Sequence, residues 1–313
     1  MKYPFEFKPD REFDVVGFGT NAVDYLITVP RYPDFSSKVE LVDYVLAPGG
    51  EVATTMVGLQ RLGLCTSYVG RFGDDDAGKL GADSLAREGV DITNAGFVAG
   101  ALTQIAFIVI DEVTGERTVI WKRDARLGYR PIDVPIELAG RARLLHLTPH
   151  DVDACIAFSH EAKAMGTVVS IDIDNLFDGI HDLLPLVDVL ITSSELPAKL
   201  TGVENLELAL EHMQSEFGCA IVGVTLGENG SLIRTNGKLI YSKGFAVPGG
   251  CKDTTGAGDS FRVGLIYGLL AGYDIEASAT MANAVAALKC RAVGARTALP
   301  TVDELSQFVS QKV

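Results

Sequence analysis

The sequence predicts an α/β fold, with a mostly parallel central sheet flanked by helices, and three patterns support this. From about residue 143, four β-rich runs alternate with helical stretches: RLLHLT, TVVSIDI, DVLITS and AIVGVTLG. Strands separated by helices imply parallel pairing with right-handed crossovers. The segment 48–63 carries apolar residues near a 3.6-residue period and ends at Gly63, as a helix does. Finally, β-rich segments at about 20–45 and 97–125 lie outside the alternation and predict a small β-sheet lid.

The remaining elements follow in chain order. FDVVGFG (13–19), DYLITV (24–29) and CTSYVGRFG predict strands, and DAGKLGADSLAREG predicts a helix that ends at its last glycine. TQIAFIVID and RTVIWKRD, joined by TGE, predict a hairpin, as does SLIRTNGKLIYSKGF. Further helices are expected at about 151–165, 180–186, 195–217, 259–271 and 275–290. We expect a single domain over residues 1–313, because no linker or internal repeat interrupts this order.

Composition argues against several classes of function. The chain has 313 residues and a formal net charge of −14, which disfavours binding to nucleic acid or to anionic membranes. No run of about 18 apolar residues occurs, and the N-terminus lacks the apolar core of a signal peptide. The five cysteines are widely spaced and include no C-x-x-C, as is typical of a reducing compartment. We therefore expect a cytoplasmic protein without a zinc site.

Motifs of other enzyme classes are absent or lack their structural context. GFGTNA (17–22) matches a dinucleotide fingerprint, but the segment after it is β-branched and interrupted by proline, so the required helix is missing. Pro149 lies between the histidines of HLTPH (146–150) and disfavours a helical metal pair. Neither a Walker G-x-x-x-x-G-K-[ST] motif nor a G-x-S-x-G motif occurs.

The segment DTTGAGD (253–259) predicts an anion-binding turn at the start of a helix. Gly256 and Gly258 remove the Cβ atoms that would block approach, so backbone N–H groups and the positive helix end can meet one anion. Such a site suits the charge on a transferring phosphoryl group. Asp259 is then placed to accept a proton from a substrate hydroxyl as a general base. The alternative is that Asp259 only caps the helix, and the residues by themselves leave both interpretations open.

Two further places carry candidate binding residues. Asp24, at the start of a predicted strand, is a good acceptor for neighbouring hydroxyls, or it is a solvated loop carboxylate. Lys122, Arg123 and Arg126 form a basic cluster on the predicted lid of an acidic protein. This cluster favours contact with an anionic group, either ATP phosphate or an acidic or phosphorylated sugar. The alternative is an alternating strand with solvated charges.

DTTGAGDSF, with five further segments in the same order, resembles the ribokinase-like (PfkB) carbohydrate kinases. The other segments are GTNAVD (19–24), PGGEVATTMVGLQRLG (48–63), VGRFGDDDAG (69–78), TLGENG (225–230) and ANAVAALKCRAVGAR (282–296). The resemblance spans nearly the whole chain and implies a ribokinase-like fold. It also implies phosphorylation of a hydroxymethyl group on a sugar or similar small alcohol, with ATP and Mg²⁺. In many members the lid mediates homodimerisation, which is therefore expected here.

The resemblance implies roles for individual residues. Asp259 matches the catalytic base, and the anion hole matches the backbone amides of Gly256, Ala257 and Gly258. The sugar-binding residues of the family match Asp24, Gly49 and Gly50. Its nucleotide-binding residues match Thr225, Gly227, Gly230 and Asn283. Ligands of a monovalent cation, K⁺ in the simplest case, match Asp253 and Thr255.

The chain departs from the family pattern at several positions. Thr54 stands where the first signature usually has Asn, so a sugar contact there is altered or lost. The family's N-x-x-E segment, linked to magnesium, is replaced by SSELPAKLTG (193–202), with Glu195 one residue early. We take Thr54 and Lys122 as candidate substrate residues and Glu195 as the candidate carboxylate for Mg²⁺. The lid side chains Gln104, Phe107, Ile120 and Lys122 are expected to shape the pocket.

Three functions are compatible with these patterns. The first is a sugar kinase that uses ATP and Mg²⁺, with Asp259 as general base. The second is a kinase of the same fold that acts on a nucleoside, a vitamin-like alcohol, a phosphosugar or a sugar acid. The third is a sensor of sugar or nucleotide without catalysis, against which the intact Asp24 and GAGD argue. Release of ADP that depends on an acceptor separates the kinases from the sensor.

Overall fold

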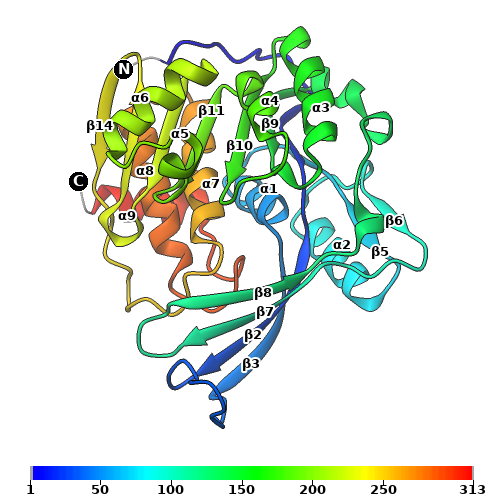
Figure 1. Cartoon of the computed structure of the whole chain (residues 1–313), viewed down its shortest axis with the longest axis vertical. Helices are drawn as coiled ribbons and strands as arrows, with labels where there is room; N and C mark the ends of the chain where they lie inside the picture. Colours follow the sequence, from blue (N-terminus) through cyan, green and yellow to red (C-terminus); the bar gives the residue numbers. More distant parts are fainter. Residues whose placement is uncertain (1–2, 312–313) are drawn as a thin grey trace.

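The structure is a computed structural model that describes residues 3–311, and its centre is an eight-stranded sheet (Figure 1). The strand order is β14-β13-β12-β11-β10-β9-β1-β4, with parallel pairing from β4 to β12 and antiparallel pairing for the last two. The strands are β1 (Phe13–Phe18), β4 (Thr66–Val69), β9 (Ala142–Leu147), β10 (Val168–Ile173), β11 (Val189–Ser193), β12 (Ile221–Thr225), β13 (Ser231–Thr235) and β14 (Lys238–Ser242).

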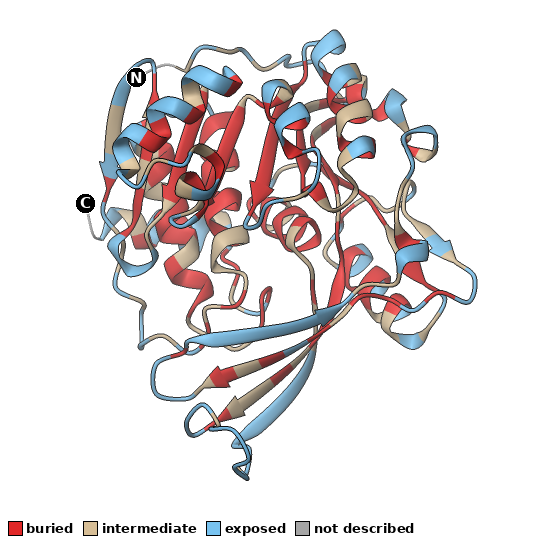
Figure 2. Cartoon of the chain, viewed as in Figure 1, coloured by how far each residue is buried: buried red, intermediate tan, exposed pale blue. Residues whose placement is uncertain are grey.

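Helices cover both faces of this sheet. One face forms a hydrophobic core with five helices: α1 (Glu51–Arg61), α2 (Asp76–Arg87), α7 (Ala257–Leu270), α8 (Ile275–Lys289) and α9 (Val302–Ser310). The opposite face is covered by α3 (Val152–Met165), α4 (Ile180–Leu183), α5 (Leu196–Thr201) and α6 (Leu206–Phe217). Successive strand residues serve opposite cores, as with Leu144 and Leu145, so the strands are buried on both faces (Figure 2). Among residues 3–311, no helix combines the length and apolarity needed to cross a membrane.

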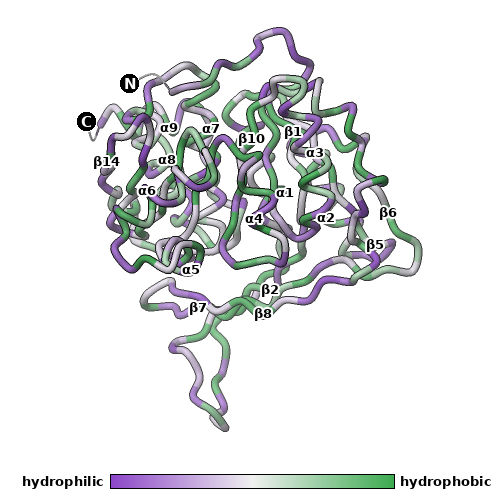
Figure 3. The backbone as a smooth tube through the Cα atoms, turned by 45° about the horizontal axis from the view of Figure 1, so that its top comes forward, coloured by the Kyte–Doolittle hydropathy of each residue, from purple (hydrophilic) through white to green (hydrophobic). Residues whose placement is uncertain are grey.

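A second, four-stranded sheet forms a lid that projects from one end of the main body (Figure 1). Its order is β3-β2-β7-β8, with strands β2 (Ala22–Val29), β3 (Asp43–Gly49), β7 (Ile105–Asp111) and β8 (Arg117–Lys122). Leu26, Ala106, Ile108 and Ile110 form a small apolar cluster of its own on the lid. Figure 3 shows hydrophobic backbone segments in the lid near the β2 and β8 labels. The α/β class with a second small sheet is confirmed.

Three predicted elements differ from the structure, and one further helix was not predicted. CTSYVGRFG is two strands, because the chain leaves the main sheet at Gly70 and β5 (Arg71–Gly73) pairs with β6 (Gly96–Val98) instead. The helical pattern through 195–217 is divided into α5 and α6, since Gly202 has a left-handed φ of 70°. The helix α9 was not predicted, although Thr301 and Glu304 form a capping box at its start. α7 begins at Ala257, earlier than expected.

The contact between α7 and α8 brings the two backbones unusually close at Gly264. A Cβ atom on Gly264 would lie 2.5 Å from Ala282 Cα and 2.6 Å from the Met281 carbonyl oxygen. Both atoms belong to the backbone and cannot turn away. Glycine at this position therefore sets the distance between the helix that carries Asp259 and the helix that carries Asn283.

We expect Gly264→Ala to lower the free energy of unfolding by about 1–3 kcal/mol, because the added methyl group forces the two helices apart. Thermal unfolding followed by circular dichroism measures this. Ser215→Ala, at an exposed position of α6, is the control and should change stability by less than about 0.5 kcal/mol. An unchanged melting temperature for Gly264→Ala would show that α7 and α8 can separate without cost.

Candidate active site

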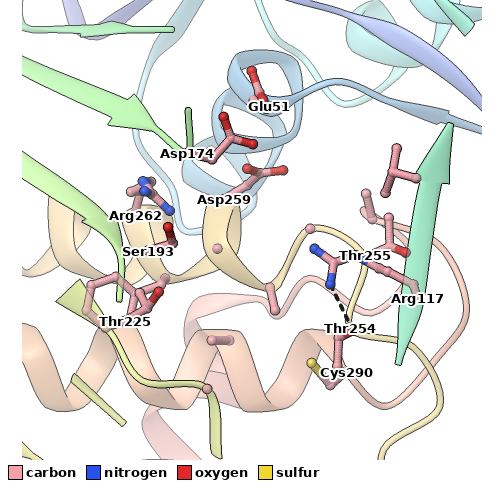
Figure 4. Close-up of a pocket in the computed structure, with 18 of the residues that line it drawn as sticks. Glu51, Arg117, Asp174, Ser193, Thr225, Thr254, Thr255, Asp259, Arg262 and Cys290 are labelled. Carbon is pink, nitrogen blue, oxygen red and sulfur yellow. Dashed lines mark hydrogen bonds between the residues drawn. The ribbon is translucent and has the colours of Figure 1, made fainter. Parts of the chain in front are cut away.

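The site is a cavity of about 1260 Å³ between the lid and the carboxyl ends of the parallel strands. Ligands of open α/β sheets bind at this edge. Its walls come from the lid, from the DTTGAGD loop with the start of α7, and from the turns after β10, β11 and β12. Figure 4 shows Asp259 and Arg262 on α7, with Ser193 and Thr225 at the ends of their strands. Segments far apart in the sequence therefore meet in one place.

The DTTGAGD loop presents unpaired backbone N–H groups to this cavity. Gly256 has a φ of 76°, and a Cβ atom there would lie 2.9 Å from Ala295 Cβ, so only glycine fits. The N–H groups of Gly256, Gly258 and Asp259 have no acceptor within residues 3–311. Ala257 differs from the prediction, because its N–H donates to the Thr254 carbonyl at 3.1 Å. The free groups at the start of a 14-residue helix form an anion site together with the helix dipole.

Asp259 is not a helix cap. Gly256 holds the N-cap position of α7, and no side chain makes a capping hydrogen bond there, so the capping interpretation is wrong. A side-chain hydrogen bond instead joins the Asp259 and Asp172 carboxyl groups, which requires a proton on one of them. Burial raises the pKa of Asp259 to about 7, with the charge of Glu51 adding to the effect and Arg262 opposing it. A carboxyl group with this pKa changes protonation state near neutral pH.

Further carboxylates, which were not predicted as site residues, make this part of the cavity acidic. Glu51 accepts a hydrogen bond from Thr20 Oγ1 at 3.2 Å, and burial raises its pKa to about 8. Asp172 lies 2.6 Å from the Arg262 guanidinium, while Asp174 also lines the cavity. Glu51, Asp174 and Asp259 are grouped in Figure 4. Two signals were present: Glu51 directly follows the glycine pair, and SIDIDN places both aspartates at the end of a strand.

Asp24 lies at the lid side of the cavity, against the glycine pair. A Cβ atom on Gly49 would lie 2.0 Å from Asp24 Oδ2, and one on Gly50 would meet Asn21 Cα at 2.4 Å. Burial raises the pKa of Asp24 to about 6, and the positive charge of Arg296 opposes this. The Asp24 carboxylate accepts no hydrogen bond from any residue among 3–311, so its oxygens are available to a ligand.

Arg296 explains the position of Thr54. The fully buried Thr54 does not reach the cavity, and its hydroxyl lies 3.3 Å from Arg296 Nε. The same guanidinium donates to the Gly49 carbonyl and, at 3.2 Å, to Ser84 Oγ. Thr54 therefore supports the arginine beside Asp24, and the expectation that it lines the substrate pocket is wrong. Arg296 itself was missed, because nothing local in VGAR indicates that it is buried.

The residues predicted to hold the nucleotide lie together beyond the loop. Thr225 ends β12, and Gly227 and Gly230 follow it; all three line the cavity with Asn283 of α8. Asn283 Nδ2 donates to Ser231 Oγ at 3.2 Å and to Ser242 oxygens at 3.0 and 3.1 Å. Its amide thus fixes the β13–β14 hairpin to α8. The apolar lining on this side of the cavity includes Ala286, Ala287 and Cys290.

The basic cluster on the lid does not face the cavity. Along β8, Arg117, Val119 and Trp121 line the cavity, so the alternation of the strand directs Lys122 to the opposite face. Arg123 forms an ion pair with Asp151 at 2.7 Å, and Arg126 forms one with Asp124 at 2.5 Å. By the same alternation, Phe107 and Ile120 lie on the face of the lid away from the pocket, whereas Gln104 lines the pocket. The prediction that Lys122 lines the substrate pocket is therefore wrong.

Glu195 also lies outside the cavity. Its side chain is 82% exposed and pairs with Lys199 at 3.7 Å. The reason is local: Ser193 ends β11 at the cavity, and two residues later the chain has already turned to the surface. Ser193 and Lys199 line the cavity, but Glu195 does not, so the expected carboxylate for Mg²⁺ is not placed there.

Of the two residues matched to a monovalent cation, Asp253 holds an ammonium group instead, while the buried Thr255 Oγ1 has no partner within residues 3–311. Asp253 is fully buried, and its carboxylate accepts the N–H groups of Thr255 and Gly294, each at 2.8 Å. Lys289 Nζ donates to the Asp253 carbonyl at 2.8 Å and lies 3.7 Å from its Oδ2. The oxygens of Asp253 are thus already satisfied by protein groups, which does not fit a potassium ion.

Comparisons with known proteins identify the family of the chain. Residues 14–302 match the pfkB family carbohydrate kinase model. An ATP-dependent ribose-1-phosphate kinase of Halopiger xanaduensis is 30% identical over 291 residues, which cover 92% of this chain and 95% of that protein. Arabidopsis thaliana ribokinase complexed with ribose and ATP has a TM-score of 0.81 at 23% identity, covering 95% and 98%. A Vibrio cholerae fructokinase mutant bound to fructose, ADP and potassium ion has a TM-score of 0.78 at 28% identity, covering 96% and 99%.

We expect Arg296→Met to lower the free energy of unfolding by about 2–4 kcal/mol, since it removes the main charge that compensates the buried Asp24 carboxylate. The loss should be larger at pH 8 than at pH 5, because protonation of Asp24 below its raised pKa removes the uncompensated charge. Urea unfolding at the two pH values measures this, with the exposed Arg87→Met as control. Equal losses at both pH values would contradict the coupling to Asp24.

Proposed function

The chain belongs to the pfkB family of carbohydrate kinases, and we propose that it transfers the γ-phosphoryl group of ATP to a hydroxymethyl group of a neutral sugar or similar small alcohol. The observation that carries this proposal is the placement of Asp259. Its carboxyl group, with a pKa raised to about 7, stands in the first turn of α7 beside unpaired N–H groups, and it shares one cavity with Asp24. A base and an anion site are thus adjacent.

In this mechanism, Asp24 orients the acceptor and Asp259 activates it. The free oxygens of Asp24 accept hydrogen bonds from sugar hydroxyls, while glycine at position 49 leaves room for the Asp24 carboxylate and Gly50 lines the cavity. Asp259, in its ionised form, accepts the proton of the hydroxymethyl group as the oxygen attacks the γ-phosphorus. The pair Asp172–Arg262 holds the Asp259 carboxyl group in the cavity. Positioning of both reactants contributes the rest of the acceleration.

The N–H groups of Gly256, Gly258 and Asp259 stabilise the charge on the transferred phosphoryl group. ATP would extend from them toward Thr225, Gly227, Gly230 and Asn283. No cluster of three or more acidic, histidine or cysteine side chains in residues 3–311 is arranged to hold a metal alone. Mg²⁺ would therefore be held with the phosphates of ATP, near the cavity carboxylates Glu51 and Asp174. When bound, it neutralises charge on the phosphoryl group.

A neutral acceptor is favoured because carboxylates dominate the acceptor side of the cavity. Asp24, Glu51, Asp172 and Asp174 all line it, and the basic cluster of the lid faces elsewhere. A phosphosugar is the second candidate, since Arg117 reaches the cavity and donates to Thr254 Oγ1 at 3.1 Å (Figure 4). The similarity to a ribose-1-phosphate kinase supports the same alternative.

We also propose that two copies associate through the outer face of the lid. Tyr44, Leu46, Phe107 and Ile120 are between 42% and 68% exposed on that face, and Tyr25 stacks on Phe107 with ring centroids 4.9 Å apart. An apolar surface of this kind favours association. Light scattering should give twice the 33.4 kDa mass of the chain.

We propose the cytoplasm as the compartment of this protein, in line with cysteines that are all free.

The decisive experiment is a panel of acceptors monitored by release of ADP. Ketoses, aldoses and nucleosides should support turnover better than sugar acids and ribose 1-phosphate. Asp259→Asn should lower kcat by about 10²–10⁴-fold while ATP still binds, because only the general base is lost. Asp303→Asn, an exposed aspartate of α9, is the matched control. Near-normal turnover by Asp259→Asn would refute the base, and no ADP release with any acceptor would refute the kinase.

The pH dependence of kcat/KM tests the raised pKa. Asp259 must be ionised to accept a proton, so kcat/KM should fall about tenfold per pH unit below about 7. A fall in kcat/KM that begins only near pH 4 in the unmodified protein would contradict this account of the site.

A further inference from the structure

A fully buried ion pair lies directly behind the phosphate-binding loop. Lys289, the last residue of α8, and Asp253, the first residue of the loop, have side chains with 0% exposure. The Lys289 ammonium group donates to the Asp253 carbonyl at 2.8 Å and lies 3.7 Å from the Asp253 carboxylate. The mechanism above uses neither residue, so their burial requires a separate explanation.

Burying an ammonium group is unfavourable unless its charge is compensated. Burial lowers the pKa of Lys289, and the negative charge of Asp253 opposes this. The end of a helix adds to the compensation, since the carbonyl end of its dipole favours a cation. The lysine is thus held at a position where the fold supplies a carboxylate, a carbonyl oxygen and a helix C-terminus together. These are also the groups that would attract a free cation.

Every oxygen of Asp253 already accepts a hydrogen bond from a protein group. One carboxylate oxygen accepts the Thr255 N–H, and the other accepts the Gly294 N–H, both at 2.8 Å. The carbonyl oxygen is bound to Lys289. A metal cation that shared these oxygens would lie next to the ammonium charge in an environment without water to screen it.

The same contacts fix the loop to α8. The N–H group of Lys252 donates to the Cys290 carbonyl at 2.9 Å, and Gly256 packs against Ala295. The segment that follows Lys289 therefore supports the loop from Lys252 to Gly256. A positive charge fixed behind the loop also favours the phosphoryl charge in front of it.

We propose that the Lys289 ammonium group is the built-in cation of this loop, so that the kinase works without the monovalent cation that its family resemblance assigns to Asp253 and Thr255. The proposal rests on the proposed kinase function. Lys289 is a positioning residue, since it acts on the phosphoryl group through the loop. The Vibrio cholerae fructokinase, whose structure holds a potassium ion, is the natural contrast.

The first test uses the unmodified protein in KCl, NaCl and choline chloride at equal ionic strength. With an active acceptor, ADP release should agree within about twofold among the three salts. The melting temperature should show no rise that is specific to KCl. A several-fold higher kcat in KCl than in choline chloride, or a melting temperature raised only by KCl, would overturn the proposal. The melting temperature tests the proposal even if no acceptor is found. Failure of this proposal can therefore be distinguished from failure of the proposed kinase function.

The second test uses variants of Lys289. Lys289→Ala removes the charge and opens a space, so its activity should fall at least tenfold in choline chloride and recover in KCl. Its melting temperature should also rise specifically with KCl. Lys289→Met fills the space without a charge and should be inactive in both salts. Lys252→Ala, the exposed neighbour, is the control and should behave like the unmodified protein. An active Lys289→Ala with no response to KCl would overturn the proposal, and if this variant does not fold, the first test is sufficient.

Discussion

The left-handed turn at Gly256 determines how the whole site is built. Its φ of 76° turns the chain from the Asp253 side into α7, and its missing Cβ lets the loop lie on Ala295. Because the helix begins at this point, three N–H groups have no partner in the described part of the chain, residues 3–311, and Asp259 falls in the first turn. The turn is held from behind by Lys289, Gly294 and the carboxylate of Asp253. Backbone geometry and charge therefore support each other at one place.

The second organising feature is the balance of buried charge around the cavity. A chain with a net charge of −14 places several carboxylates in a space that must also accept phosphate. Arg262 pairs with Asp172, Arg296 lies near Asp24, and Lys289 pairs with Asp253. Each cation thus offsets one carboxylate, while Asp259 and Glu51 keep raised pKa values. Burial by itself would leave these carboxyl groups protonated, and the nearby cations lower the pKa of Asp259 toward neutral pH.

Local sequence determined the fold class and the centre of the site. The regular alternation of strands and helices after residue 143 follows from side-chain periodicity, so it predicted the parallel sheet. The glycines of DTTGAGD and the GG pair act through their own backbone conformation, and that property is visible without neighbours. The resemblance to the PfkB kinases, confirmed over residues 14–302, rests on the same short segments. The roles of the matched residues, and the treatment of the chain as one domain, stay predictions.

Tertiary structure decided everything that depends on direction and on distant partners. Lys122 faces away because the register of β8 with β7 places Trp121 toward the cavity, and register is set by the whole sheet. Glu51, Asp172 and Arg296 come from three separated segments and acquire their importance only from shared burial. Lys289 pairs with a residue 36 positions away, so no local pattern could show that its ammonium group lies behind the loop. The sequence by itself determined which groups are present, and packing decided which of them meet.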